Sequence, residues 1–554
     1  MIIENELKKA GYLLAGLETT SAVPETGRLD FYISSDNLRS AVQSFKNGAW
    51  GYLSAITGQD LGKENGKLEV LYHFCSGPAV TTLRVQQSRN EGAVLPSIAD
   101  IIPAAAFFER ELQEMLGYQL EGLPDSGRLF LPDDWPENVF PMRTDFEISQ
   151  AAPVSLKPAQ STAPEKGNTF VVPIGPQHPA LKEPGHFEFT VDGEVVTAAR
   201  MRLGYAHRGI EKAAESRNWN QNLYLFERVC GICSHTHAMA YSMGVEKIAQ
   251  VEVPERAQAI RELVAGLERL HSHLLWLGVA AHEAGFDTLF MYSWRDRETV
   301  MNLLEQLTGN RVNYSANVLG GVKCDVGPQQ AEALRTGLKY LETRIRHYLE
   351  VVTTDAVFLT RTRGVGTISF EEAVAFGILG PTARASGLVR DIRVEAPYGA
   401  YHKFPVSAIT GKNGDLEARF VVRLEELLVS CFTMRTIVDN LPEGPLSVRV
   451  PRKIPVGETI SRVEAPRGEL LYYIRSDGGE TPARVHLRTP SLCNWVSVLE
   501  KAVGRQLADV PMLIAGMDPC FSCNDRMVTV VGNDKRKTWT WEQLREYGIE
   551  YYKK

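Results

Sequence analysis

The chain has 554 residues, 44% of them hydrophobic and 23% charged, with a formal net charge of −7. A chain of this length and composition has enough apolar residues for several globular domains. Its slightly acidic balance argues against a nucleic-acid partner, because nucleic-acid-binding proteins usually carry a basic patch. The first 21 residues lack the apolar centre of a signal peptide, and no apolar run reaches the ~20 residues that cross a bilayer. We therefore expect a cytosolic protein, or one held at a membrane by partners.

The N-terminal part of the chain mixes strand-like and helical patterns. Residues 67–74 and 81–87 read as strands, and 96–117 carries a helical pattern. These patterns predict an α+β domain over residues 1–147. The stretch 148–168 is rich in Pro, Ala and Ser and has no hydrophobic periodicity, which predicts an extended linker.

A second domain, over residues 169–526, is predicted to be mainly α-helical. Residues 186–202 alternate apolar and polar side chains around Asp192-Gly193, the pattern of a β-hairpin. Long segments with apolar residues every three or four positions then predict a helix bundle at the centre of the domain. Cys431 lies on one such apolar stripe, so we expect it to pack in the core. The helical segments are 253–278, 328–352 and 415–441.

Two CxxC pairs are the most informative feature of the chain. Cys230 and Cys233 lie in "RVCGIC", and Cys520 and Cys523 lie in "DPCFSC", with most of the second domain between them. Three kinds of site are compatible with these pairs: a structural zinc ion, a thioredoxin-like dithiol, and a redox-active metal held between the pairs. Zinc modules usually keep their pairs ~15–20 residues apart, and a thioredoxin dithiol needs a βαβ context. The wide separation therefore favours a redox-active metal deep inside the domain.

These motifs resemble those of nickel–iron hydrogenase large subunits, which carry R-I/V-C-G-x-C and D-P-C-x-x-C. The stretches 174–187 and 204–212 are similar to the 49-kDa subunit of complex I, and 107–146 is similar to its 30-kDa subunit. The chain is identified, by this resemblance, as a member of the complex-I-related, membrane-bound (group 4) hydrogenase large subunits. The fusion of 30-kDa-like and 49-kDa-like parts is typical of the formate hydrogenlyase type.

The resemblance implies a metal centre and a reaction. Nickel would be held by Cys230, Cys233, Cys520 and Cys523, and the second cysteine of each pair would also bind iron carrying CO and cyanide. The reaction implied is reversible heterolytic cleavage of H2, with Cys520 as the base that takes the proton. Cysteine spacing typical of ferredoxins is absent from the sequence, so we expect no iron–sulfur cluster in this chain.

Four further residues receive roles from the resemblance. Glu183, in "KEPGHF", would relay protons, although Pro184 interrupts the family's motif and a solvated loop carboxylate is the alternative. Arg467, in "EAPRGEL", would lie over the metals and be oriented by Asp518; the alternative is an arginine in a surface turn. Glu211, in "HRGIEK", would bind a structural magnesium ion.

The histidines are not expected to bind the metals. His235 and His237 follow the first cysteine pair, and we interpret them as supporting or core side chains, since the family's ligands are sulfur only. His178, in "GPQHP", corresponds to a quinone-contacting loop of complex I. The histidines on or near the first bundle helix are expected to be core or interface residues: His271, His273 and His282.

The resemblance also implies partners and processing. Electrons would pass to a small subunit with a 4Fe–4S cluster, next to ferredoxin-like and membrane subunits, on the cytoplasmic face of the inner membrane. A maturation protease would remove residues 527–554 by cutting after Arg526. The alternative function is a complex-I-like NADH/quinone oxidoreductase subunit without its own nickel–iron centre. Both thiol pairs argue against that alternative.

Overall fold

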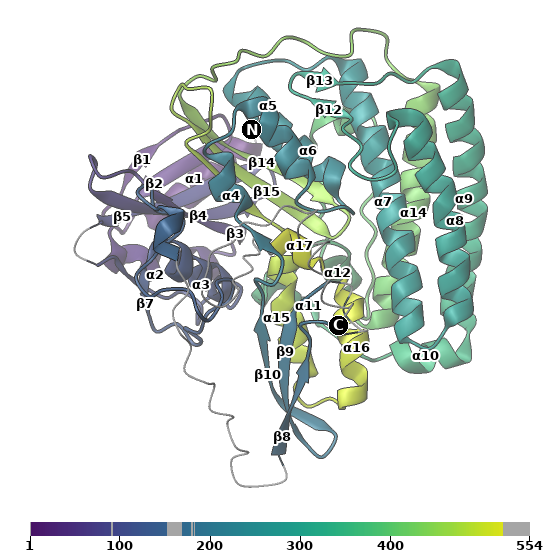
Figure 1. The fold of residues 1–554 in the computed structure, drawn as a ribbon, viewed down its shortest axis with the longest axis horizontal. Coiled ribbons are helices and arrows are strands. Elements are labelled where there is room, and N and C mark those ends of the chain that lie inside the picture. Colours follow the sequence, from purple (N-terminus) through teal and green to yellow (C-terminus); the bar gives the residue numbers. More distant parts are fainter. Residues whose placement is uncertain (1, 90–91, 152–168, 179–180, 182, 525–554) are drawn as a thin grey trace, which may run out of the picture.

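The computed structural model describes residues 2–89, 92–151, 169–178, 181 and 183–524 (Figure 1). Of the predicted linker, Ile148–Ala151 forms a short 3-10 helix, and the rest lies outside the described residues. The predicted extension 527–554 lies outside them as well. Within the described ranges, no helix is long and apolar enough to cross a membrane.

The N-terminal domain is built on a five-stranded sheet with the order β1-β2-β5-β4-β3. β2 and β5 run parallel, and the other neighbours run antiparallel. The helix predicted over 96–117 is shorter than expected: α3 begins at Ala105, because Pro103 disfavours a helix in the residues before it. Glu109 on α3 accepts the N–H of Ile98 (2.8 Å) from that preceding stretch. The elements are α1 (Ile2–Leu14), β1 (Thr20–Ala22), β2 (Arg28–Tyr32), α2 (Ser35–Asn47), β3 (Tyr52–Asp60), β4 (Lys67–Ser76), β5 (Ala79–Ser88), β6 (Val94–Pro96), α3 (Ala105–Leu116) and β7 (Gln119–Glu121).

The second domain opens with a three-stranded antiparallel sheet of the order β10-β9-β8. The predicted hairpin is confirmed: Asp192 pairs with Val195, and Gly193 takes the left-handed φ of 61° that a tight turn needs. The elements up to the bundle are β8 (Thr169–Ile174), β9 (His186–Asp192), β10 (Val195–Arg202), β11 (His207–Arg208), α4 (Ile210–Ala214), α5 (Trp219–Glu227) and α6 (Ser234–Ile248).

Four long helices form the bundle that stands beside this sheet (Figure 1). Three were predicted: α7 (Glu255–Glu283), α9 (Pro328–Thr354) and α14 (Leu416–Asp439). The fourth, α8 (Asp287–Thr308), packs against α7 and α9 and was not predicted. The bundle core contains fully buried leucines from the predicted stripes: Leu263, Leu267, Leu270, Leu274, Leu338 and Leu341. The predicted fold class, an α+β domain joined to a mainly helical one, is confirmed.

A third sheet lies between the bundle and the N-terminal domain (Figure 1). It consists of β14 (Gly457–Ala465), β15 (Gly468–Ser476) and β16 (Arg484–Arg488), and it contacts α6 on one side and β3 on the other. The remaining elements are β12 (Asn317–Val318), β13 (Gly321–Val322), α10 (Ala356–Thr362), α11 (Phe370–Ala375), α12 (Gly380–Ala385), α13 (Ile392–Glu395), the 3-10 helices η2 (Gly399–His402) and η3 (Leu507–Asp509), α15 (Pro490–Ala502), α16 (Val510–Met517) and α17 (Phe521–Asn524).

The burial of Cys431 in the bundle gives a testable prediction. Cys431 is 0% exposed among apolar neighbours, whereas the next residue, Phe432, is 65% exposed. We expect Cys431→Ala to lower the free energy of unfolding by about 1 kcal/mol through lost packing. Denaturant unfolding measures the change, and Phe432→Ala is the matched control with little effect. An unchanged free energy of unfolding in Cys431→Ala, or an equal loss in Phe432→Ala, would contradict a packing role.

Candidate metal centre

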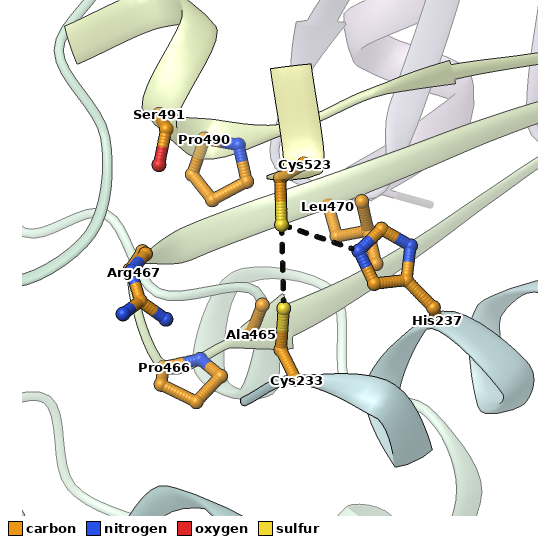
Figure 2. Close-up of a pocket in the computed structure, with 9 residues that line it drawn as sticks. All are labelled: Cys233, His237, Ala465, Pro466, Arg467, Leu470, Pro490, Ser491 and Cys523. Atoms are coloured by element: carbon orange, nitrogen blue, oxygen red, sulfur yellow. Dashed lines mark hydrogen bonds between the residues drawn. The ribbon is translucent and has the colours of Figure 1, made fainter. Parts of the chain in front are cut away.

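The two CxxC pairs meet in the interior of the second domain. The Sγ atoms of Cys230 and Cys520 lie 3.3 Å apart. Those of Cys233 and Cys523 lie 3.6 Å apart, and Figure 2 shows this second contact. Every one of these side chains is at most 4% exposed. The first cysteine of one pair therefore faces the first of the other, and the second faces the second.

The first pair is positioned by a carboxylate from the bundle. Cys233 is the N-cap of α6 but makes no side-chain cap, so the first N–H groups of that helix need another acceptor. Glu268 on α7 accepts the N–H of His235 (2.7 Å) and of Thr236 (3.1 Å), and also the hydroxyl of Thr236. Burial raises the pKa of Glu268 to about 8. The bundle thus fixes the start of α6 and, with it, Cys233.

An ion pair fixes the chain segment that leads into the second cysteine pair. Arg467 lies at the tip of the β14–β15 hairpin and is 3% exposed. Its Nε donates to the carbonyl of Asp518 (2.8 Å), and its Nη2 donates to the carboxylate of Asp518 (2.9 Å). Asp518 has a left-handed φ of 61°, which turns the chain sharply between α16 and Cys520.

Two more contacts fix the segment between Cys520 and Cys523. The N–H of Cys520 donates to Ser491 Oγ (3.2 Å), and the N–H of Ser522 donates to Glu183 Oε2 (2.9 Å). The hydroxyl of Ser522 also donates to the Glu183 carboxylate. Glu183 is partly buried and so lies directly against the second CxxC motif.

The four thiols change one another's protonation. Hydrogen bonds from the thiols of Cys233, Cys520 and Cys523 lower the pKa of Cys230 well below its ordinary value, and the guanidinium of Arg467 adds to this effect. The hydrogen bond to Cys230 in turn raises the pKa of Cys233 to about 11. Several thiolates this close together repel one another, so a bound cation is what would stabilise them all.

A small cavity opens beside Cys233 and Cys523 (Figure 2). Its walls are mostly apolar, but the guanidinium of Arg467 and the hydroxyl of Ser491 line it as well. The space next to the second cysteine of each pair is thus mostly apolar, with the polar side chains of Arg467, Ser491 and His237 at its edge. Besides the two cysteines, the lining residues are His237, Ala465, Pro466, Arg467, Leu470, Pro490 and Ser491.

The histidines near the thiols take different roles. His237 Nε2 lies 3.6 Å from Cys523 Sγ, and its Nδ1 lies 2.7 Å from the hydroxyl of Tyr472. His235 lies 2.9 Å from the carbonyl of Arg261 and contacts Asn317, and burial lowers its pKa to about 3.

The remaining predicted histidines divide between the core and the surface. The buried His271 accepts a hydrogen bond from Arg297, and the buried His273 lies 3.4 Å from Glu426. His282 and His178 are exposed.

Glu211 is in contact with a fixed positive charge. Arg484 donates to Glu211 Oε2 (2.7 Å), and the N–H of Leu487 donates to Oε1 (3.1 Å). Glu111 and His486 lie close enough to complete a three-residue group around this carboxylate. Both oxygens of Glu211 already accept from donors, and a magnesium ion would have to displace Arg484. The residues present therefore do not fit the predicted magnesium site.

Sequence reasoning missed Glu268 and Ser491. Ser491 follows a strand and opens a helix, a context without a known metal motif. Glu268 reads as one polar position in a long helix, because its contact with α6 bridges 32 or 33 residues of sequence.

Family comparisons match most of the chain. The family described as the 30 Kd subunit of respiratory-chain NADH dehydrogenase matches residues 31–152. The 49 Kd subunit of the same enzyme matches 283–454 and 448–526. Between them, the nickel-dependent hydrogenase family matches 208–279, which contains the first cysteine pair.

Individual proteins extend these matches. Formate hydrogenlyase subunit 5 of Escherichia coli strain K12 is 37% identical over 91% of this chain and 90% of its own length. Membrane-bound hydrogenase subunit alpha of Pyrococcus furiosus is 39% identical over 68% of this chain and 92% of its own. A solved chain of a membrane-bound sulfane sulfur reductase, an archaeal respiratory membrane complex, is 34% identical with a TM-score of 0.63, over 66% of this chain and all of that one. The chain therefore belongs to the large subunits of complex-I-related (group 4) nickel–iron hydrogenases, fused to a domain like the 30-kDa subunit of complex I.

Proposed function

We propose that this chain is the catalytic large subunit of a nickel–iron hydrogenase that interconverts H2 with protons and electrons. The observation that carries the proposal is the meeting of four buried thiols beside a cavity lined by Arg467. Thiolates are soft ligands suited to nickel and iron. The large sequence separation of the pairs, 290 residues, argues against a compact zinc module.

The residues present fit a nickel–iron group. Cys230, Cys233, Cys520 and Cys523 would hold nickel, and Cys233 and Cys523 would also serve as ligands of the iron. The apolar walls of the cavity suit CO, while Arg467 and Ser491 would donate hydrogen bonds to cyanide. When bound, the group would supply the heterolytic cleavage of H2.

The protein's own residues would handle the proton and the charge. Cys520 Sγ would take the proton, and Glu183 would carry it away from the second CxxC motif, which it already contacts through Ser522. Arg467, held by Asp518, would place a fixed positive charge beside the thiolates.

Two other functions are less well supported. A subunit of a quinone oxidoreductase without its own metal is compatible with the 49-kDa match, but it gives no function to the four buried thiols that lie together. The sulfane sulfur reductase named above shows that the fold alone does not set the substrate. A closed zinc site would use all four thiolates on one ion and would leave the adjoining cavity and its arginine unexplained.

Partners follow from the same proposal. For electron transfer we propose a small subunit with a 4Fe–4S cluster, within a formate hydrogenlyase-type assembly of ferredoxin-like and membrane subunits on the cytoplasmic face of the inner membrane. The named relatives of membrane-bound complexes support this. A maturation protease that cuts after Arg526 remains part of the proposal, and the 49 Kd family match ends at the same residue.

The four paired cysteines should act as one unit. Serine at any of Cys230, Cys233, Cys520 or Cys523 is expected to release nickel and abolish both H2 uptake and H2 evolution, because the hydroxyl is a poor ligand for a soft metal. Metal analysis and a hydrogen-electrode assay measure both effects. Cys324→Ser, at a partly exposed cysteine, is the control and should keep both. Full activity in Cys520→Ser would contradict the metal centre.

Arg467→Lys tests whether turnover depends on the positive charge of this side chain or on its planar shape. Lysine keeps the positive charge but loses the planar fork that binds the Asp518 carbonyl and carboxylate together. We expect nickel content near that of the wild type and turnover lower by roughly 100-fold. Arg475→Lys, on the same strand pair but in contact with Gln59 instead, is the control. Unchanged turnover in Arg467→Lys would show that this residue does not act at the metal centre.

Glu183→Gln tests the proton relay. The amide can still accept from Ser522, but it cannot take up a proton, so isotope exchange between H2 and D2O should fall sharply while nickel is retained. Mass spectrometry of the gas phase measures the exchange. The exposed Glu188 on β9 provides the control substitution Glu188→Gln. Normal exchange in Glu183→Gln would show that protons take another route.

A further inference from the structure

The N-terminal domain reaches the walls of the metal centre through one packed interface. Strand β3 of that domain lies against β15 and β16 of the central sheet. An apolar cluster joins the two domains there. Its buried members include Ala55, Leu71, Ile460, Leu471 and Tyr473. Polar side chains next to this cluster also form hydrogen bonds between the two domains.

Ser54 is the centre of these polar contacts. The β3–β4 ladder is interrupted at this residue, since Leu53 pairs with Phe74 and Ala55 already pairs with His73. Such a bulge changes the direction in which a side chain points and leaves the residue unpaired in the ladder. The carbonyl of Ser54 accepts from Arg488 Nε (2.7 Å).

The hydroxyl of Ser54 bridges two charged residues of the second domain. It donates to Glu469 Oε1 (2.5 Å) and accepts from Arg488 Nη2 (2.7 Å). Arg488 also donates to the carbonyl and carboxylate of Glu469. Ser54, Glu469 and Arg488 are each at most 2% exposed, so water does not weaken these bonds.

Glu469 and Arg488 each adjoin one wall of the cavity. Glu469 follows Arg467 by two residues and lies next to the tip of the hairpin that carries that arginine. Arg488 ends β16, one residue before Pro490 and Ser491 at the start of α15. The linking residue, Thr489, donates to the side chain of Asn524 (2.8 Å), next to Cys523.

We propose that Ser54 of the N-terminal domain is a positioning residue for the metal centre. By bridging Glu469 and Arg488 it sets the spacing between the wall that carries Arg467 and the wall that carries Ser491. This inference rests on the proposed nickel–iron function. It gives the N-terminal domain a part in shaping the centre.

A second polar network across the same interface provides a matched comparison. Glu458, at the other end of β14, accepts from Arg28 (2.9 Å) and Arg84 (2.8 Å) of the N-terminal domain and from Tyr473 (2.8 Å). It precedes Glu464, the strand partner of Glu469, by six residues, which is ~20 Å along a strand. Both networks pair a glutamate with arginines, but the Glu458 network lies far from the cavity.

The test is infrared spectroscopy of the metal-loaded, full-length protein, which reports the CO and cyanide vibrations of the iron. Ser54→Ala is expected to shift these bands and to lower kcat for H2 oxidation by roughly tenfold, with KM unchanged and nickel retained. Ser54→Thr restores the hydroxyl and should restore the wild-type bands. Ser54→Cys keeps the side-chain volume while weakening both hydrogen bonds, and should shift them again.

Glu458→Gln is the control: it should lower Tm and leave the bands in place. Unshifted bands in Ser54→Ala and Ser54→Cys would overturn the inference, and so would an equal shift in Glu458→Gln. If Ser54→Ala does not fold, the comparison of Ser54→Cys with Ser54→Thr decides alone. A metal-loaded wild type without such bands would instead contradict the proposed function, and the inference with it.

Discussion

The packing of four sulfur atoms into one buried cluster is the constraint on which the rest of the structure depends. Cys230 and Cys520 are 290 residues apart in sequence and 3.3 Å apart in space. Thiolates at such distances repel one another and lose hydration, so neither pair can hold its place through local structure alone. Each pair therefore relies on distant supports: the Glu268 carboxylate for the first, and Arg467, Ser491 and Glu183 for the second.

Ser491 lies at the start of α15, and the other three supports come from three layers of the molecule. The bundle supplies Glu268, the central sheet supplies Arg467, and the β8–β10 region supplies Glu183 next to β9 (Figure 1). Buried charges are costly unless they are paired, and Arg467 meets this condition through Asp518. The N-terminal domain adds a fourth layer, which backs the central sheet at Ser54. The cysteines are thus held by hydrogen bonds from several separate elements of the fold.

Much of this arrangement could be predicted from the sequence, and the reason differs between features. The helices α7, α9 and α14 follow from their apolar period, and the β9–β10 hairpin follows from its Asp-Gly turn, since both signals are local. The cysteines were recognised from two short motifs. The contact between Arg467 and Asp518 was expected from those motifs as well. The central sheet was missed because β14 and β15 are buried on both faces and lack polar alternation. The ion pair of Glu211 with Arg484 was missed because it joins residues 273 positions apart.

The central claim is that the thiol cluster holds nickel and an iron that carries diatomic ligands. Metal analysis combined with infrared spectroscopy, on protein purified under nickel-replete, anaerobic conditions, tests it most directly. The account predicts one nickel and one iron per chain, with vibrations of CO and cyanide bound to the iron. Zinc in the cluster, or metal without these vibrations, would contradict it.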